Sequence, residues 1–251
     1  MSNKDLLFEG AVLFDRLDAN NQSTGLRPLG STDKLSITLN SETKRATTKE
    51  RGSYGQTTAS AVIPQPTDVA LVIKNMEPAN LAMALLGDVS DYSQGAGTFT
   101  ETAVTAKLGS YVEIGFRGLT SGAETVTNAD GTTTYVRGTD YEINHRHGWI
   151  MGLVGGSIAA NAELQVSGSY VAVEAKKVSA GTDAILRGKL VLDGRNLMTG
   201  EEVLVTLKRV TLSPNGELDF LSADPITAAF AGTLETPNIG ESPMEILYGI
   251  Q

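Results

Sequence analysis

The chain has 251 residues and no cysteine, and its 29 Asp and Glu residues against 20 Lys and Arg residues give a formal net charge of −9. The lack of cysteine excludes disulfides, thiolate metal sites and thiol nucleophiles. The acidic balance excludes a general binder of the nucleic-acid backbone, which needs clustered cations, and a hydrophobic content of 41% excludes a disordered or membrane-embedded chain.

No segment has the features of a signal peptide or of a membrane span. The longest weakly polar run, residues 149–160, is too short and too rich in glycine to cross a bilayer. Near the N-terminus, Asp5 and Glu9 interrupt any apolar stretch of signal-peptide length. We therefore expect a protein that is made and used without export through a signal peptide.

The first 90 residues predict a mainly β segment with one short helix. Residues 12–17 are apolar enough for a strand, and the polar residues 18–25 predict a turn. Residues 35–39 alternate, so their three aliphatic side chains are expected on one face, whereas the continuous apolar run 69–73 predicts a strand buried on both faces. Residues 78–86 predict the helix, with Pro near its start and leucines four residues apart forming a buried stripe.

Residues 41–60 form a long polar excursion between two of these strands. The segment has almost no large aliphatic side chain, and residues 42–51 carry four cations and two anions within an acidic protein. One interpretation is a solvated loop. The other is a protruding hairpin tip that meets an acidic partner surface, because a long excursion without a core is unusual in a compact domain unless it has a function.

Residues 91–177 differ in composition and predict a separate small β-sandwich. This segment is richer in Gly, Ser and Thr and carries its own short strands at regular spacing. Asp130-Gly131 predicts a hairpin turn between two of them. The expected strands are 111–116, 125–127, 133–136, 141–143, 149–151, 164–166 and 170–173, and residues 176–182 are expected to be an exit linker.

Residues 178–251 return to the style of the first segment. Strands are expected at 185–193, 203–210 and 230–234, the last of these being the final strand. The tail from 235 to 251 is expected to extend along a surface. The sequence therefore predicts one sheet system built from residues 1–90 and 178–251, with residues 91–177 inserted.

A search for catalytic and ligand-binding motifs finds none that stands. His145 and His147 lack a third ligand for a metal, and the alternating Asp18, Asn20 and Gln22 lack the acidic twelfth residue of a calcium loop. The single Trp149 and low aromatic content argue against a sugar-stacking platform. We therefore expect no catalytic, cofactor-binding or metal-binding residues, no cofactor and no enzymatic activity; an acidic, glycine-rich β protein of this kind is typical of assembly through strand edges and arms.

Several segments follow one another in a recognisable order. They are residues 7–13, 25–31, 43–56 with Arg51-Gly-Ser-Tyr-Gly55, 80–87, 141–144 followed by 148–150 and Ile158, and 188–196 with Gly200-Glu201. Their order resembles that of the bacteriophage tail tube (major tail) proteins, and the resemblance covers most of the chain.

The resemblance implies a tail-tube-type β-sandwich or barrel with one short helix and a small inserted β-sandwich module. Such proteins form stacked, typically hexameric rings that make a tube for DNA in the virion tail, and they are assembled in the host cytoplasm. Expected partners are further copies of the chain and other tail proteins (tape measure, distal tail and terminator), with genomic DNA passing through unbound and no membrane contact. By position, the excursion is the hairpin that contacts neighbouring subunits, through Lys44, Arg45, Lys49, Arg51 and Tyr54.

The charge of the C-terminal segment is compatible with a DNA channel. Residues 193–251 carry nine acidic and three basic side chains, a net charge of −6. Because a cationic bore would hold the DNA polyanion, acidic side chains are expected in the lumen, with Glu201, Glu202, Glu217 and Asp219 as candidates; ordinary solubility charge is the alternative. A carbohydrate-binding or adhesion module, or an enzyme with an unrecognised site, are alternatives for the whole protein.

Overall fold

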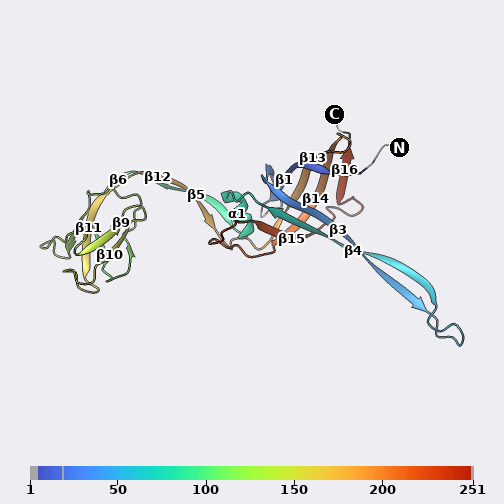
Figure 1. The fold of residues 1–251 in the computed structure, drawn as a ribbon, viewed down its shortest axis with the longest axis horizontal. Coiled ribbons are helices and arrows are strands. Elements are labelled where there is room, and N and C mark those ends of the chain that lie inside the picture. The colour runs from blue at the N-terminus through green and yellow to red at the C-terminus, as the bar shows by residue number, and fades with distance from the viewer. Residues whose placement is uncertain (1–4, 19, 250–251) are drawn as a thin grey trace. The chain divides into compact units, whose positions relative to one another are not determined.

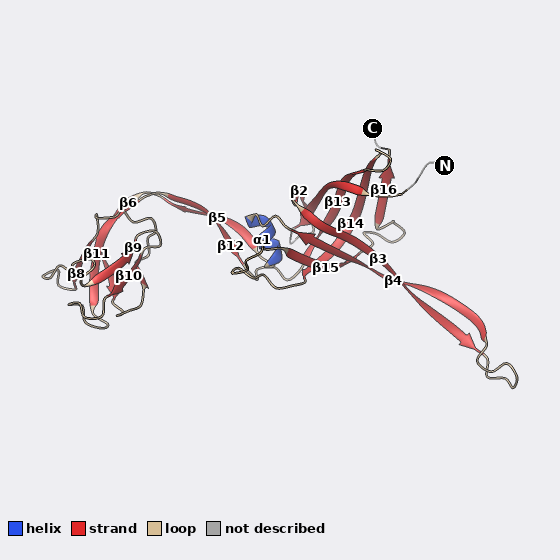
Figure 2. Cartoon of the chain, in the orientation of Figure 1, coloured by secondary structure: helices blue, strands red, loops and turns tan. Residues whose placement is uncertain are grey.

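The computed structural model describes residues 5–18 and 20–249, which form a mainly β protein with one short helix (Figure 2). The expected mainly β fold class is confirmed. The chain divides into two compact units. Unit 1 comprises the described residues of 1–90 and 178–251, and unit 2 comprises residues 91–177.

Unit 1 is built on one antiparallel sheet with the strand order β2-β1-β13-β14-β15-β4-β3 (Figure 1). Along the second edge of β14, β16 pairs with Val203–Leu207 and β15 pairs with Val210–Pro214. Strands from both ends of the chain therefore share one sheet. The elements are β1 (Phe8–Leu17), β2 (Ser23–Pro28), β3 (Thr32–Thr47), β4 (Thr57–Ile73), α1 (Pro78–Ala84), β13 (Leu186–Asn196), β14 (Glu202–Pro214), β15 (Ala228–Leu234) and β16 (Met244–Tyr248).

The core of unit 1 lies on one face of this sheet. Phe14, Leu190 and Leu207 occupy paired positions on β1, β13 and β14, and all three are almost fully buried. Met83 and Ala84 of α1 pack against the same cluster. Because burial of one such large side chain contributes about 1.5–3 kcal/mol, the row across the strands and its helical cover hold the sheet in register.

Two expectations about buried faces of strands are wrong. Leu35 and Ile37 pack against the core, but Leu39 is 78% exposed because the register of β3 against β4 shifts at this residue. Residues 69–73 alternate between buried and partly exposed side chains, so β4 is buried on one face only. In both strands the sheet has a core face and an open face, as antiparallel sheets commonly do.

The helix exists, but its buried face differs from the one expected. Leu81 and Leu85 are only partly buried, whereas Asn80, Ala82 and Met83 are buried. Asn80 is fully buried because its amide nitrogen donates to the carbonyl oxygens of Leu29 and Asn75, at 2.9 and 2.8 Å. A polar side chain with its hydrogen bonds satisfied thus fastens α1 to the sheet.

Two segments expected to be irregular contain strands. The turn expected over 18–25 is shorter, because β2 begins at Ser23; Ala19 lies outside the described residues. The tail expected to run along a surface over 235–251 includes β16, so the strand at 230–234 is not the final one. Residues 250–251 lie outside the described part of the chain.

Unit 2 is a small β-sandwich, as expected. Its two antiparallel sheets have the orders β7-β10-β9 and β6-β11-β8. Ile143 and Ile150 from the first sheet share one core with Val126, Leu164 and Val166 from the second. The strands are β6 (Gly97–Thr105), β7 (Val112–Glu113), β8 (Thr125–Asn128), β9 (Tyr141–Asn144), β10 (Trp149–Gly152) and β11 (Glu163–Tyr170).

Several expected strand bounds in unit 2 are wrong. The strand expected at 111–116 is reduced to β7, and 133–136 joins β8 only through isolated hydrogen bonds. Residues 170–173, expected to form one strand, are divided between two: Tyr170 ends β11 and Val173 begins the next strand, β12 (Val173–Ser179). Residues 176–179 of the expected exit linker belong to that strand.

The chain leaves unit 1 along β5 (Asp88–Gln94) and returns along β12 (Val173–Ser179), and these two strands pair with each other. Gln94 and Ser179 thus belong to one ribbon although 84 residues of chain separate them. In the described residues, no helix has the length and apolar character needed to cross a bilayer.

Candidate assembly surface

The polar excursion of the sequence is a long β-hairpin formed by β3 and β4. Their pairing runs from Thr32↔Ile73 beside the core to Thr47↔Thr57 near the tip. The neighbouring strand β15 pairs with β4 only as far as Thr67. Beyond that point β3 and β4 have only each other, and they extend away from the sheet as a two-stranded arm (Figure 1). A solvated loop is therefore the wrong interpretation of this segment.

The arm has no core of its own. Every residue of 41–47 and 57–64 is exposed, on both faces of the ribbon. Val62 is 66% and Ile63 38% exposed. Because an isolated two-stranded hairpin is at best marginally stable in water, these apolar side chains and the open ribbon favour a partner that covers them.

The tip of the arm is closed by backbone hydrogen bonds. The amide of Thr48 donates to the carbonyl of Gln56 at 2.9 Å, and the amide of Gly55 donates to the carbonyl of Thr48 at 2.8 Å. Gly55 has φ +86°, a backbone conformation that residues other than glycine rarely adopt. These bonds present Tyr54, 76% exposed, at the far end of the arm.

All five expected contact residues lie on this arm and are exposed: Lys44, Arg45, Lys49, Arg51 and Tyr54. Lys44 lies 4.0 Å from the carboxylate of Glu42. Within residues 5–18 and 20–249, no carboxylate lies within ion-pair distance of the other three cations. The arm therefore carries cationic charge that the rest of the described chain does not neutralise.

The four acidic candidates for a channel lining are exposed, but the structure does not bring them together. Glu201 and Glu202 stand at the start of β14, and Glu217 and Asp219 follow its end. At about 3.3 Å per residue, β14 is about 40 Å long, and the two pairs flank its opposite ends. They form two acidic sites at opposite ends of one strand.

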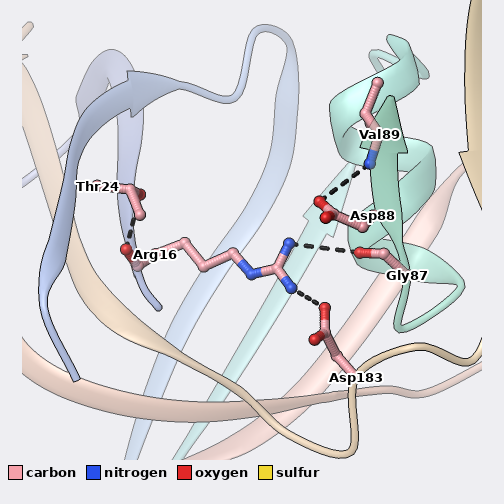
Figure 3. Close-up of polar contacts among 6 residues, drawn as sticks. All are labelled: Arg16, Thr24, Gly87, Asp88, Val89 and Asp183. Carbon is pink, nitrogen blue, oxygen red and sulfur yellow. Dashed lines mark hydrogen bonds and ion pairs between the residues drawn. The ribbon is translucent and has the colours of Figure 1, made fainter. Parts of the chain in front are cut away.

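A partly buried polar network holds the sheet to the segments through which the chain leaves and re-enters unit 1 (Figure 3). The guanidinium of Arg16 on β1 donates to the carbonyl of Gly87 at 3.3 Å and forms an ion pair with Asp183. The backbone amide of Asp183 donates to the carbonyl of Leu86 at 2.9 Å. These contacts fix the exit at Gly87 and the return at Asp183 against the same strand.

Arg27 of β2 is a second partly buried cation that sequence reasoning missed. Its Nη2 donates to the side-chain oxygen of Asn80 at 2.9 Å, and within the described chain its buried Nη1 has no hydrogen-bond partner. Burial lowers the pKa of this guanidinium, and the charge of Glu77 opposes the shift. Arg27 helps to hold α1 against the sheet because the fold brings it next to Asn80, and the sequence does not show this proximity.

The two histidines of unit 2 have different surroundings: His145 lies beside a carboxylate, and His147 stacks on an aromatic ring. Nε2 of His145 lies 3.1 Å from Oε1 of Glu124, whose side chain is only 5% exposed and which also lies 3.5 Å from Arg137. Burial would raise the pKa of Glu124, but hydrogen bonds from backbone amides and the contact with His145 outweigh it and lower the pKa. Among the described residues, no group of three or more His, Asp or Glu side chains is placed to hold a metal ion.

The chain's only Trp, Trp149, is half-buried and lies outside the core cluster of unit 2. The ring of His147 stacks on Trp149 at 4.7 Å between centroids, and Tyr111 lies 6.2 Å away at 44°. On the same face of the sheet, Glu113 and Asn144 pair with Trp149 from either side. The argument against an aromatic platform is weakened, because a few aromatic residues gather at one place.

The comparison with protein families covers both units. Residues 5–236 match the family described as protein of unknown function UCP028589. The chain belongs to this family. No curated protein matches the chain. The family match includes all of unit 2 and every strand of unit 1 except β16.

Proposed function

We propose that this protein is a structural subunit that assembles with copies of itself into stacked rings, forming the tail tube of a bacteriophage. The observation that carries the proposal is the β3–β4 arm: a long ribbon, exposed on both faces, with apolar side chains and unneutralised cations. A monomer gains nothing from such an arm, whereas an assembly covers it. The resemblance of segment order to tail tube proteins supplies the type of assembly.

In this proposal the rings are hexameric and the partners are further copies of the chain and other tail proteins. The subunit has no catalytic role, and DNA passes through the tube without specific binding. The net charge of −9 supports that passage, because an anionic wall releases a polyanion that a cationic wall would retain. The protein would be assembled in the host cytoplasm and reside in the virion tail.

The test is assembly of the purified chain with and without the end of the arm. Negative-stain electron microscopy and sedimentation should show rings or tubes for the intact protein. Joining Thr43 to Gln56, which deletes residues 44–55, should abolish them without changing the unfolding midpoint, since the core of unit 1 lies elsewhere. Arg51→Glu should weaken assembly, and Arg146→Glu in unit 2, an equal change of charge, should not. Continued assembly after the deletion would remove the arm from this account.

A second candidate function, carbohydrate binding, is favoured by the surface of unit 2. The exposed ring of Tyr111 and the neighbouring Trp149 offer flat apolar faces for sugar rings, and Glu113 and Asn144 offer hydrogen-bonding groups beside them. Because Trp149 is the only Trp, its fluorescence reports directly on this surface. Neutral oligosaccharides should shift that signal, Tyr111→Ala should weaken the effect about tenfold, and Val154→Ala, an exposed change elsewhere in unit 2, should leave it unchanged. A signal that no oligosaccharide alters would exclude this function.

A further inference from the structure

The sheet of unit 1 has an apolar groove on the face opposite its core. The groove has a volume of about 480 Å³. Leu13 on β1 pairs with Val191 on β13, and Asp193 on β13 pairs with Leu204 on β14, so these side chains share the outer face. None of the three apolar residues belongs to the core cluster of unit 1. The lining is Leu13, Leu26, Val191, Asp193, Glu202, Val203 and Leu204.

The groove is lined by apolar side chains and by two carboxylates. Leu26 at one end is 47% exposed. Asp193 and Glu202 are the two carboxylates, and Glu202 lies 3.8 Å from the guanidinium of Arg195. In the described residues Asp193 has no cation within 4.0 Å. An occupant that fits this surface is apolar and carries a cation.

One face of the arm has that character. Pairing of Thr43 with Val62, and of Arg45 with Ser60, places these four side chains on one face of the ribbon together with Pro64. This face carries exposed apolar groups, a cation without an acidic partner and no carboxylate. The opposite face carries Glu42 and Lys44, whose charges offset one another.

We propose that the groove on β1, β13 and β14 receives the β3–β4 arm of a second copy, with the face that bears Val62 and Arg45 turned inward. This inference rests on the proposed self-assembly and names its acceptor surface. Val62 lies against Leu204 and Val191, and Arg45 meets Asp193. The contact covers apolar surface on both sides and pairs two charges that are otherwise unmatched.

The proposal changes the role of one acidic residue. Glu202 was a candidate for a channel lining, but in the groove it becomes part of a subunit contact. Glu217 and Asp219, at the far end of β14, are unaffected and stay candidates for the channel.

The first test uses the absence of cysteine, which makes any introduced thiol unique. Val62→Cys in one preparation and Leu204→Cys in a second, size-tagged one are mixed under assembly conditions and oxidised. We expect a mixed disulfide between the two preparations on a non-reducing gel. Ile63→Cys, one residue along and on the opposite face, should give several-fold less product with the same partner. Equal yields from the two positions would overturn the proposal.

The second test exchanges the charges. Arg45→Glu alone and Asp193→Arg alone should each raise the concentration needed for assembly about tenfold or more, and the double variant should recover most of the loss. Lys107→Glu in unit 2 is the control that matches the change of net charge in Arg45→Glu. If the intact chain assembles and the double variant recovers nothing, the acceptor surface is wrong and the proposed function stands. If the intact chain does not assemble, both fail.

Discussion

Single residues decide whether the tight turns of unit 2 can form. Gly148 has φ +70°, and a Cβ placed there would lie 1.6 Å from the carbonyl oxygen of Phe116. Gly148→Ala should therefore destabilise unit 2 by about 3 kcal/mol or more, measured by thermal unfolding. Gly95→Ala is the control, because a Cβ at that position meets nothing within 4 Å and its φ is not in the left-handed region. Similar losses for the two variants would contradict this account of Gly148.

The carboxylate of Glu124 gives unit 2 a dependence of stability on acid. Its pKa is lowered in the folded state from an ordinary value of 4.5. The stabilisation is therefore fully present above that value and is lost as pH falls through the lower, folded pKa. We expect the thermal unfolding midpoint of unit 2 to decrease as the pH falls below about 4.5. Glu124→Gln should lower the stability at pH 7 and flatten this decrease, which is the acid limb of the stability curve. An unchanged acid limb in the variant would show that other carboxylates cause it.

At the residue scale, the sequence reveals exposed charge more readily than buried polarity. The cations of the arm were recognised because Lys44 and Arg45 stand in a segment without aliphatic neighbours. Asn80 and Arg27 were missed, because an Asn in a helix and an Arg in a strand are ordinary until the fold brings them within 2.9 Å. The sequence does not show that Tyr111 lies beside Trp149, so it gives no sign of the aromatic cluster.

At the scale of elements, strands with one buried face were predictable and polar strands were not. The alternating run over 203–210 is part of β14, because Val203, Val205 and Leu207 are buried at every second position before the register against β13 shifts. β5 and β6 were missed, since their stretches 88–94 and 97–105 are mostly Ser, Thr, Asp and Gly. The sequence is compatible with two interpretations of the arm for the same reason: its pairing is made by the backbone, which leaves no pattern in the side chains.

The strand β16 pairs with the N-terminal part of β14 and should be needed for the full stability of unit 1. β16 pairs with Val203–Leu207, Met244 packs against the core, and Glu245 lies 2.5 Å from Lys208. Truncation after Pro237 should lower the free energy of unfolding by about 2 kcal/mol or more, mainly through the loss of Met244, while β13 keeps β14 in place. Urea unfolding measures this loss. An unchanged midpoint would show that β16 contributes no net stability.

At the scale of the whole molecule, the two units have separate cores and should fold separately. The core clusters of unit 1 and unit 2 have no residue in common. Residues 91–177 expressed alone should give a dispersed amide NMR spectrum, and the chain with these residues replaced by a short turn should keep the strands of unit 1. Calorimetry of the intact chain should show two transitions. An unfolded isolated unit 2 would mean that it depends on the remainder.

The paired strands β5 and β12 have a consequence for engineering and for diversification. Arg16 contacts both Gly87, where the chain leaves the sheet, and Asp183, where it returns. These contacts hold the two ends of the inserted segment next to each other, and they do not depend on which residues lie between them. Any compact module with neighbouring ends would fit there without disturbing the sheet that carries it. An assembly of such subunits would carry one inserted unit per copy. A weak contact made by that unit would then be repeated along the assembly, and the repeated contacts together would bind strongly.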